Sequence, residues 1–242
     1  MNVLVLGSSG YIGSVLAKEL EKCGHNVLYY DQKNHPPRRI EDQNIFKYIV
    51  TKSDIVFHLA SPVLINESKE NPYKYWKGVY GTTNIVYEAC EIFGKKLIYI
   101  STQVVGDDFR CQECGQHLSP YASAKAEAEK LVLKNPSSLV FRLPNVYDFE
   151  DLDPYKERLV PRLSNMARNE GTIKIYPPLD TKVNLLEVHM CAKQLIYNMD
   201  RAGLIVLNGE TYTIEEVAKI IASKYNAKVE IVEQPQYRTW RK

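Results

Sequence analysis

Three glycines follow directly on a short apolar run at the start of the chain. Residues 3–6 are Val-Leu-Val-Leu, and the segment GSSGYIG occupies positions 7–13. An apolar run of this length predicts a strand that is buried on both faces. Gly7 permits a tight turn, Gly10 allows close approach to a diphosphate, and Gly13 allows a helix to pack on the strand. Because the N–H groups at the start of that helix can bind phosphate oxygens, the segment predicts a dinucleotide site.

An acidic residue ends the second predicted strand, where dinucleotide sites hold the adenosine ribose. Residues 27–30 form this strand, and Asp31 follows it. A carboxylate at that position accepts hydrogen bonds from the ribose hydroxyls and repels a 2'-phosphate, which favours NAD over NADP. Arg38 and Arg39 follow in a loop and weaken this preference, because guanidinium groups bind phosphate. We therefore predict NAD as the cofactor.

Tyr121 and Lys125 stand four residues apart in the segment SPYASAK at positions 119–125. Ser119 is a predicted N-cap and Pro120 a first-turn residue, so a helix is expected to begin here. Side chains at i and i+4 share a helix face, which brings the lysine ammonium close to the phenol. A free tyrosine has a pKa near ~10, and acid–base chemistry near neutrality needs a shift of roughly three units. A nearby cation and an oxidised nicotinamide would supply it, although the spacing alone also fits an accidental pair on a solvated helix face.

Two further predicted strands point to the edge of a sheet at which ligands bind. Residues 55–59 are an apolar run that is broken at 60–62, and residues 97–100 lead towards Thr102. In doubly wound sheets, ligands bind at the carboxyl ends of the strands, so we expect Thr102 at the ligand-bearing edge. His58 lies within an apolar strand, and we interpret it as a core residue and not as a catalytic base.

Strands and helices alternate as far as about residue 142. This alternation predicts an α/β fold of the Rossmann type, with a doubly wound parallel sheet and right-handed crossovers. We expect residues 1–147 to form an NAD-binding domain, with 183–208 returning to it. Residues 148–182 and 209–242 are expected to form a small, shortened C-terminal substrate lobe. Further helices are predicted at 72–93, 155–168, 188–199 and, from a capping-box pattern, after Thr213.

Composition and charge narrow the class of protein. The chain has 242 residues, enough for one large or two small domains with a substantial core. Its net charge is +2, from 31 basic and 29 acidic residues, so we expect no nucleic-acid partner and no anionic membrane partner. No apolar stretch approaches the roughly 20 residues of a membrane span. Five cysteines at irregular spacings do not suggest a disulfide framework, so a cytoplasmic location is expected.

Taken together, these segments resemble the extended short-chain dehydrogenase/reductases, in particular the NAD-dependent sugar-nucleotide epimerase/dehydratase group typified by UDP-galactose 4-epimerase. The resemblance spans nearly all of the chain. It rests on GSSGYIG at 7–13, HLAS at 58–61, GVYGTTN at 78–84, ISTQVVG at 100–106, SPYASAK at 119–125 and FRLPNVY at 141–147, together with Asp31.

The resemblance implies an enzyme with a catalytic set. According to this resemblance, Tyr121 exchanges a proton with a sugar hydroxyl while hydride moves to or from nicotinamide. Thr102 hydrogen-bonds the same oxygen, and Lys125 binds the nicotinamide ribose and acidifies Tyr121. The implied cofactor-binding residues are Gly7, Ser9, Gly10, Tyr11, Ile12, Gly13, Asp31, Leu59, Ala60, Ser61, Tyr121, Lys125 and Leu143.

The resemblance also implies a nucleotide-sugar substrate and a homodimer. Thr102 and Gln103 are the expected substrate contacts near the reacting carbon, and Asn145 matches an asparagine that meets the diphosphate. Arg162 is a further candidate phosphate partner, for which the alternative is a solvated helix face.

Two departures from the family pattern narrow the predicted chemistry. Val104 stands where the dehydratases and decarboxylases have a glutamate and the epimerase-reductases a cysteine, and Gln103 replaces the dehydratases' aspartate. A valine moves no proton, so elimination of water lacks its extra acid or base. We therefore predict 4-epimerisation through a transient 4-keto sugar, with NAD(P)-dependent ketone reduction as the alternative. A dinucleotide-binding sensor or assembly subunit without turnover is an alternative of a different class.

Cys111, Cys114 and His117 have the residue types and spacing of a partial zinc site. A fourth ligand is not evident in the sequence. A loop with incidental reduced thiols is the alternative reading, and we predict no metal centre.

Overall fold

The structure is a computed structural model that describes residues 1–34, 37–62, 65–106, 111, 114–117, 119–148 and 158–233. The chain divides into two compact units. Unit 1 consists of Met1–Pro144 and His189–Leu207, and unit 2 consists of Asn145–Val188 and Asn208–Lys242.

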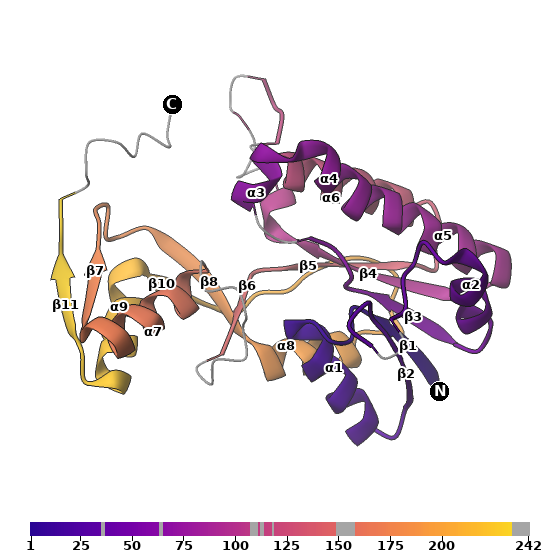
Figure 1. Cartoon of the computed structure of the whole chain (residues 1–242), viewed down its shortest axis with the longest axis horizontal. Coiled ribbons are helices and arrows are strands. Elements are labelled where there is room, and N and C mark those ends of the chain that lie inside the picture. The colour runs from indigo at the N-terminus through magenta and orange to yellow at the C-terminus, as the bar shows by residue number, and fades with distance from the viewer. Residues whose placement is uncertain are drawn as a thin grey trace. The chain divides into compact units, whose positions relative to one another are not determined.

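Within the described part of unit 1, six parallel strands form one sheet in the order β2-β1-β3-β4-β5-β9 (Figure 1). The strands are β1 (Asn2–Leu6), β2 (Asn26–Tyr30), β3 (Ile55–His58), β4 (Lys96–Thr102), β5 (Leu139–Leu143) and β9 (Gly203–Val206). The order reverses direction between β1 and β3, which is the point where doubly wound sheets bind ligands. The predicted Rossmann-type fold is confirmed.

Helices cover both faces of this sheet (Figure 1). On one face lie α1 (Tyr11–Lys22) and α8 (Val188–Tyr197). On the other lie α2 (Gln43–Thr51), α4 (Pro72–Trp76), α5 (Thr82–Phe93) and α6 (Pro120–Val132), and the short helix α3 (Ile65–Glu70) contacts α6. Because helices cover both faces, the inner strands bury nearly every side chain, which explains their continuous apolar runs.

The helix predicted at 72–93 contains an irregular turn. A π-helical turn, η1 (Lys77–Gly81), joins α4 to α5. Gly94 ends the helix in the left-handed conformation with φ of 59°, as the sequence predicts. Tyr75 of α4 and Val79 of η1 are buried in a cluster with Tyr121 and Ala124, so this region packs against α6. π-Helical turns are frequent near functional sites.

The described part of unit 2 contains two small sheets. In one, β8 (Lys182–Glu187) pairs with β6 (Asn145–Tyr147) and β10 (Glu210–Thr213); in the other, β7 (Thr172–Ile175) pairs with β11 (Lys228–Ile231). Helices α7 (Leu159–Glu170) and α9 (Ile214–Tyr225) pack against each other and against β7.

Two helix predictions in unit 2 can be compared with the structure. Thr213 caps α9, since its side chain accepts a hydrogen bond from the Glu216 N–H at 3.1 Å and the Glu216 carboxylate accepts one in return. The capping box is thus confirmed. The helix predicted at 155–168 is observed from Leu159, and positions 155–157 fall outside the described residues. Residues 145–147 and 183–188, which we expected in the first domain, belong to unit 2 because β8 pairs with β6 and β10, and residue 208 belongs to unit 2 as well.

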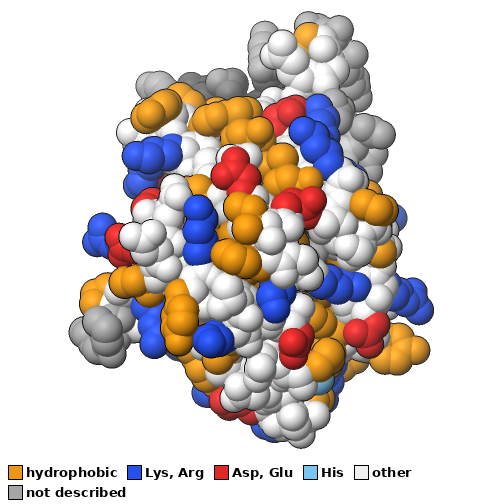
Figure 2. Space-filling model, turned by 90° about the vertical axis from the view of Figure 1, so that its right-hand side faces the viewer, with side chains coloured by type: hydrophobic (Ala, Val, Ile, Leu, Met, Phe, Trp, Pro, Cys, Tyr) orange, Lys and Arg blue, Asp and Glu red, His pale blue; other side chains and the backbone are white. Residues whose placement is uncertain are grey.

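The surface in Figure 2 carries Lys and Arg side chains interspersed with Asp and Glu side chains. This face therefore shows no extended patch of a single sign, in keeping with the balanced composition. Across the described residues, no helix has the length and apolar character needed to cross a bilayer.

Candidate active site

Backbone contacts close the glycine turn between β1 and α1 so tightly that side chains do not fit. Gly7 has φ of 87°, and its N–H donates to the Tyr30 carbonyl at 2.9 Å. A Cβ atom on Gly13 would lie 2.1 Å from the Gly7 oxygen, and one on Gly10 would lie 3.1 Å from the same atom. Gly7 and Gly13 are therefore required by the turn, which brings the start of α1 to the carboxyl edge of the sheet.

Asp31 follows β2, and its carboxylate is tied to the glycine turn. Oδ2 accepts a hydrogen bond from the Ser9 N–H at 3.1 Å, and Oδ1 accepts one from the Lys33 N–H at 2.9 Å. A carboxylate has about four acceptor positions, so capacity remains for ribose hydroxyls. Arg38 donates through Nη1 to the Tyr29 carbonyl at 2.8 Å, which engages part of its guanidinium with the backbone.

The other predicted cofactor residues lie along the same edge of the sheet. Leu59 extends the β3 ladder by donating to the Leu6 carbonyl at 3.0 Å, and a Cβ atom on Gly7 would lie 2.9 Å from the Ala60 nitrogen. Leu143 ends β5 opposite Thr102. Tyr11 and Ile12 begin α1, and Ser61 follows Ala60. The glycine turn and the ends of β3 and β5 thus form an edge that suits a dinucleotide, and the contact made by each residue stays a prediction.

Tyr121 and Lys125 lie in the first two turns of α6, as predicted. The Ser119 side chain caps the helix by accepting a hydrogen bond from the Ala122 N–H at 3.1 Å. Both candidate side chains are buried, with 7% of Tyr121 and 3% of Lys125 exposed. The Lys125 Nζ lies 6.0 Å from the centroid of the Tyr121 ring. The pair is therefore packed inside unit 1 and is not part of a solvated helix face.

The surroundings of Lys125 make its charge costly. Its Nζ donates to the Ile100 carbonyl at 2.8 Å and lies 4.6 Å from the centroid of the Tyr99 ring. Burial lowers the pKa of Lys125 to about 7, and the negative charge of Glu129 acts in the opposite direction. Ile100 precedes Thr102 on β4, so this hydrogen bond ties the lysine to the strand that carries the predicted hydroxyl.

Thr102 ends β4 at the carboxyl edge of the sheet, and its Oγ1 accepts a hydrogen bond from the Val104 N–H at 3.4 Å. Val104 packs against a small buried cluster formed by Tyr75, Val79, Tyr121 and Ala124. Val104 is thus an apolar neighbour of the Tyr121 cluster. It occupies the position at which dehydratases of the resembling family have a second acid or base.

Contacts from α3 and α4 fix the position of Tyr121. Its N–H donates to the Ser68 Oγ at 3.3 Å, and its ring meets the Tyr75 ring edge-on with centroids 6.2 Å apart. The Tyr75 hydroxyl in turn donates to the Glu67 carboxylate at 2.9 Å. Sequence reasoning missed Ser68, because no local pattern links it to a helix that begins more than fifty positions later.

Glu129 of α6 and Arg142 of β5 form a partly buried ion pair, and Glu129 is the member next to Lys125 along α6. Glu129 lies one turn after Lys125 and is 3% exposed. The Arg142 Nε lies 3.0 and 3.1 Å from its two carboxylate oxygens, and Nη2 lies 2.7 Å from Oε2. The sequence analysis missed this pair. The i, i+4 spacing from Lys125 could have indicated Glu129, whereas only the packing of α6 on β5 identifies Arg142.

The predicted substrate residues are divided between the two units. In unit 1, Gln103 donates through Nε2 to the Leu207 carbonyl at 2.9 Å. Asn145 and Arg162 belong to unit 2, where both are exposed, and the Asn145 Nδ2 lies 3.5 Å from the Asn184 carbonyl. The structure thus holds the three candidate catalytic residues on the neighbouring elements β4 and α6 of unit 1, and the substrate roles of the unit 2 residues stay predictions.

His58 is a core residue, as the sequence analysis interprets it. It is 1% exposed, and its Nε2 lies 3.1 Å from the Thr83 Oγ1. The Thr83 hydroxyl donates to the Val79 carbonyl at 2.6 Å, so Nε2 carries the proton in the contact with Thr83. Burial lowers the pKa of His58 to about 3, so the ring stays neutral at physiological pH.

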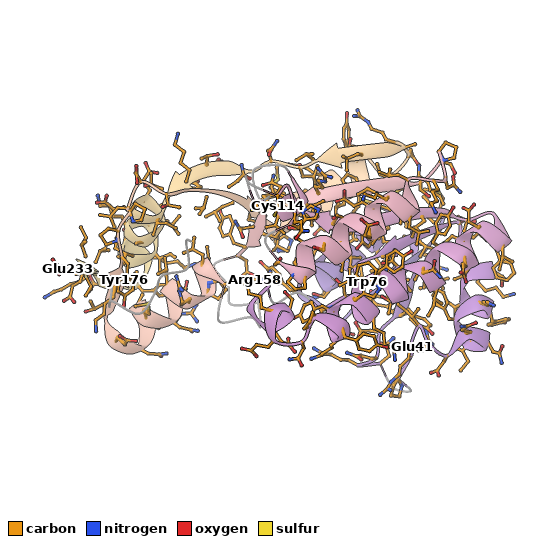
Figure 3. All side chains as sticks on the ribbon, turned by 90° about the horizontal axis from the view of Figure 1, so that it is seen from above. Glu41, Trp76, Cys114, Arg158, Tyr176 and Glu233 are labelled. Atoms are coloured by element: carbon orange, nitrogen blue, oxygen red, sulfur yellow. The ribbon has the colours of Figure 1, made fainter. Side chains whose placement is uncertain are left out.

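A backbone hydrogen bond joins two described residues of the cysteine-containing segment before α6. Cys111 donates through its N–H to the Gln116 carbonyl at 2.8 Å, and Gly115 has φ of 67°. Figure 3 marks Cys114, which is exposed. Within the described ranges, no three His, Cys, Asp or Glu residues gather closely enough to hold a metal ion. The described residues therefore give no support to a metal site at this segment. Positions 112–113 lie outside the described ranges.

Comparisons with known proteins agree on one family. Residues 3–207 match the family model described as the NAD dependent epimerase/dehydratase family. The 2-alkyl-3-oxoalkanoate reductase of Stenotrophomonas maltophilia is 28% identical over 216 residues, which are 76% of this chain and 61% of the relative. The UDP-glucose 4-epimerase of Lacticaseibacillus casei is 28% identical over 152 residues, 54% of this chain and 46% of the relative. The chain therefore spans less than two thirds of the length of each of these curated relatives.

A solved structure shows the same fold. The UDP-glucose 4-epimerase of Thermotoga maritima, determined with UDP-glucose, superposes with a TM-score of 0.83 at 22% identity and covers 99% of this chain and 87% of its own. At this identity the likeness concerns the fold.

Proposed function

We propose that this chain, which belongs to the NAD-dependent epimerase/dehydratase family of enzymes, oxidises and reduces one carbinol of a nucleotide-activated sugar. The reaction that we propose first is 4-epimerisation through a transient 4-keto sugar. The observation that carries the proposal is the buried Tyr121–Lys125 pair, which α6 holds against the strand that ends in Thr102. A buried phenol beside a buried amine suits proton transfer to and from a hydroxyl.

In the proposed reaction, the Tyr121 oxygen takes the proton of the sugar hydroxyl and later returns it. The Thr102 hydroxyl hydrogen-bonds the same sugar oxygen and holds it in place. Lys125, when protonated, stabilises negative charge on the Tyr121 oxygen and can donate to the nicotinamide ribose. NAD, when bound, supplies the acceptor for the hydride from the carbinol carbon. For 4-epimerisation, the keto sugar must rotate within the site, so that the hydride returns to the opposite face of the carbonyl carbon.

The residues at the carboxyl edge of the sheet fit NAD. The turn that needs Gly7 and Gly13 places the start of α1 where it can bind a diphosphate. Asp31, held by the Ser9 N–H, is suited to accept hydrogen bonds from the adenosine ribose, and its negative charge disfavours the 2'-phosphate of NADP. We therefore propose NAD over NADP.

Val104 favours simple redox chemistry over dehydration. It packs against the cluster that contains Tyr121, where a second proton-transfer group would be needed for elimination of water. A one-way ketone reductase is the second candidate, because a relative that matches 76% of the chain is named a reductase. Both reactions use the same three residues. They differ in the source of the hydride that reduces the keto sugar: an epimerase first takes it from the same sugar, whereas a reductase takes it from reduced cofactor supplied from solution.

We also propose substrate contacts and an assembly. Gln103 and Asn145 would contact the sugar and the diphosphate, and Arg162 would bind a phosphate oxygen. A homodimer is proposed through α5 and α6, the helices that follow the Thr83 and Tyr121 regions. A cytoplasmic location stays a prediction from composition.

A substrate panel tests the proposed function. The purified full chain, supplied with NAD, is incubated separately with UDP-, GDP-, dTDP- and CDP-sugars. NMR follows isomer interconversion, and absorbance follows reduced nicotinamide. An epimerase interconverts two isomers without net build-up of reduced cofactor, whereas a reductase consumes reduced cofactor when a keto sugar is supplied. A chain that binds NAD and turns over no sugar would be a sensor or assembly subunit, and the proposal of an enzyme would fall.

A further inference from the structure

Titratable and charged groups approach Lys125 from several packed elements. His58 of β3, Tyr99 of β4, and Tyr121 and Glu129 of α6 have a ring contact or an electrostatic interaction with Lys125. Arg142 of β5 reaches Lys125 through Glu129. On the side of α3 and α4, Tyr75 packs on the Tyr121 ring and donates to Glu67, which is also paired with Lys74.

Of these groups, His58 and Tyr99 carry no charge near neutral pH. Burial lowers the pKa of His58 to about 3 and raises the pKa of Tyr99 well above its usual value. The charge balance at Lys125 therefore depends on Glu129 and on the guanidinium of Arg142 that faces it. The carboxylate is 3% exposed, so water screens its field weakly.

We propose that the Glu129–Arg142 ion pair sets the protonation state of Lys125 and, through it, the alkaline limit of catalysis. Glu129 and Arg142 act as positioning residues, since neither is assigned a contact with substrate or cofactor. The link to the alkaline limit rests on the proposed function, whereas the link to the lysine's protonation does not.

The two members of the pair act on Lys125 in opposite directions. Glu129 lies one helical turn away and attracts the proton of Lys125, while Arg142 cancels part of that attraction by binding both carboxylate oxygens. Removing the carboxylate charge takes away the attraction that favours the protonated lysine and so favours the neutral amine. Removing the guanidinium charge leaves the full carboxylate charge facing the ammonium and favours the protonated form.

The alkaline limit follows because the neutral amine no longer stabilises negative charge on the Tyr121 oxygen. As the pH rises through the pKa of Lys125, the proposed turnover falls. A variant that lowers this pKa therefore loses activity at a lower pH than wild type, and a variant that raises it keeps activity to a higher pH.

The test compares Glu129→Gln and Arg142→Gln in the full-length chain. NMR of 13C-labelled lysine reports the pKa of Lys125, with Lys125→Met used to assign the signal, and kcat/KM is measured across pH with the productive sugar. We expect Glu129→Gln to lower this pKa, and the alkaline limit with it, by about one unit, and Arg142→Gln to raise both by about one unit. Glu127→Gln is the matched control, because Glu127 lies on the same helix but is exposed and paired with Lys130; it should move neither.

A second variant covers loss of folding. Arg142→Gln leaves a buried carboxylate without its partner, which can unfold the chain. The double variant Glu129→Gln with Arg142→Gln removes both charges, and its Lys125 pKa should return to within about half a unit of wild type. Shifts of both single variants in the same direction, or no shift in Glu129→Gln, would overturn the proposal. If the pKa responds as expected but no nucleotide sugar reacts, the proposed function fails while the control of Lys125 stands.

Discussion

Replacing Gly13 by alanine tests the glycine turn that would hold the cofactor. Gly→Ala inside a helix ordinarily stabilises a protein by about 0.5–1 kcal/mol. In this structure the new Cβ atom would lie 2.1 Å from the Gly7 oxygen and 3.0 Å from its carbonyl carbon. Both are backbone atoms of the turn, so the clash is relieved only if α1 and the turn move apart. Overpacking of this kind costs about 1–3 kcal/mol, and we expect a net loss of about 2 kcal/mol.

Gly81→Ala is the matched control for that change. Gly81 has helical angles with φ of −60°, and its new Cβ atom would find only the Lys77 Cγ, at 3.8 Å. The same chemical change should therefore stabilise the protein by about 0.5–1 kcal/mol. The two substitutions are thus predicted to have effects of opposite sign on the free energy of unfolding.

Urea denaturation of both variants, with and without NAD, provides the measurement. We expect Gly13→Ala to unfold at lower urea and to bind NAD about tenfold more weakly, since tenfold corresponds to about 1.4 kcal/mol of binding free energy. Gly81→Ala should unfold at higher urea and bind NAD normally. If Gly13→Ala had wild-type stability and wild-type affinity for NAD, the reasoning about the turn would be refuted.

Two further predictions concern Asp31 and Lys125. Asp31→Ala should weaken NAD binding by about tenfold and narrow the preference for NAD over NADP in competitive titrations. An unaltered preference would mean that Arg38 and Arg39 set it. For Lys125, the pKa is about 7 in the folded state, against an ordinary value of 10.5 for lysine, so between these pH values the unfolded chain holds a proton that the folded chain lacks. Wild-type stability should then rise with pH across that window. Lys125→Met should be more stable than wild type at pH 7, by up to about 5 kcal/mol from the difference of 3.5 between the two pKa values. In denaturation experiments this gain in stability should shrink towards pH 10. The control Lys130→Met, at an exposed lysine, should show no such trend.

Local patterns carry most of what the sequence predicts correctly. The glycine turn, the apolar runs of β1 and β3 and the cap at Ser119 each involve neighbours in sequence, so their geometry follows from backbone sterics and helix capping. The i, i+4 spacing of Tyr121 and Lys125 likewise indicates their common helix. These features define the carboxyl edge of the sheet and the candidate catalytic helix before any coordinates are known.

Features that depend on tertiary contacts could not be predicted in this way. Arg142 meets Glu129 because β5 packs beneath α6, and Ser68 reaches the Tyr121 N–H from a separate helix. The boundary between residues 188 and 189, in place of the expected one at 183, depends on the pairing of β8 with β6 and β10, which no local pattern fixes. Burial, which sets the charge state of Lys125, is likewise a property of the packed structure.

The central claim is that the Tyr121 oxygen transfers the proton in a reaction that uses bound NAD. Its most direct test is the turnover of Tyr121→Phe with the sugar nucleotide identified by the panel, measured beside the affinity of the same variant for NAD. We expect turnover to fall by about a thousandfold, within the range for loss of a general acid–base group, while the affinity for NAD stays within about twofold of wild type. Turnover at the wild-type rate in Tyr121→Phe would contradict the account.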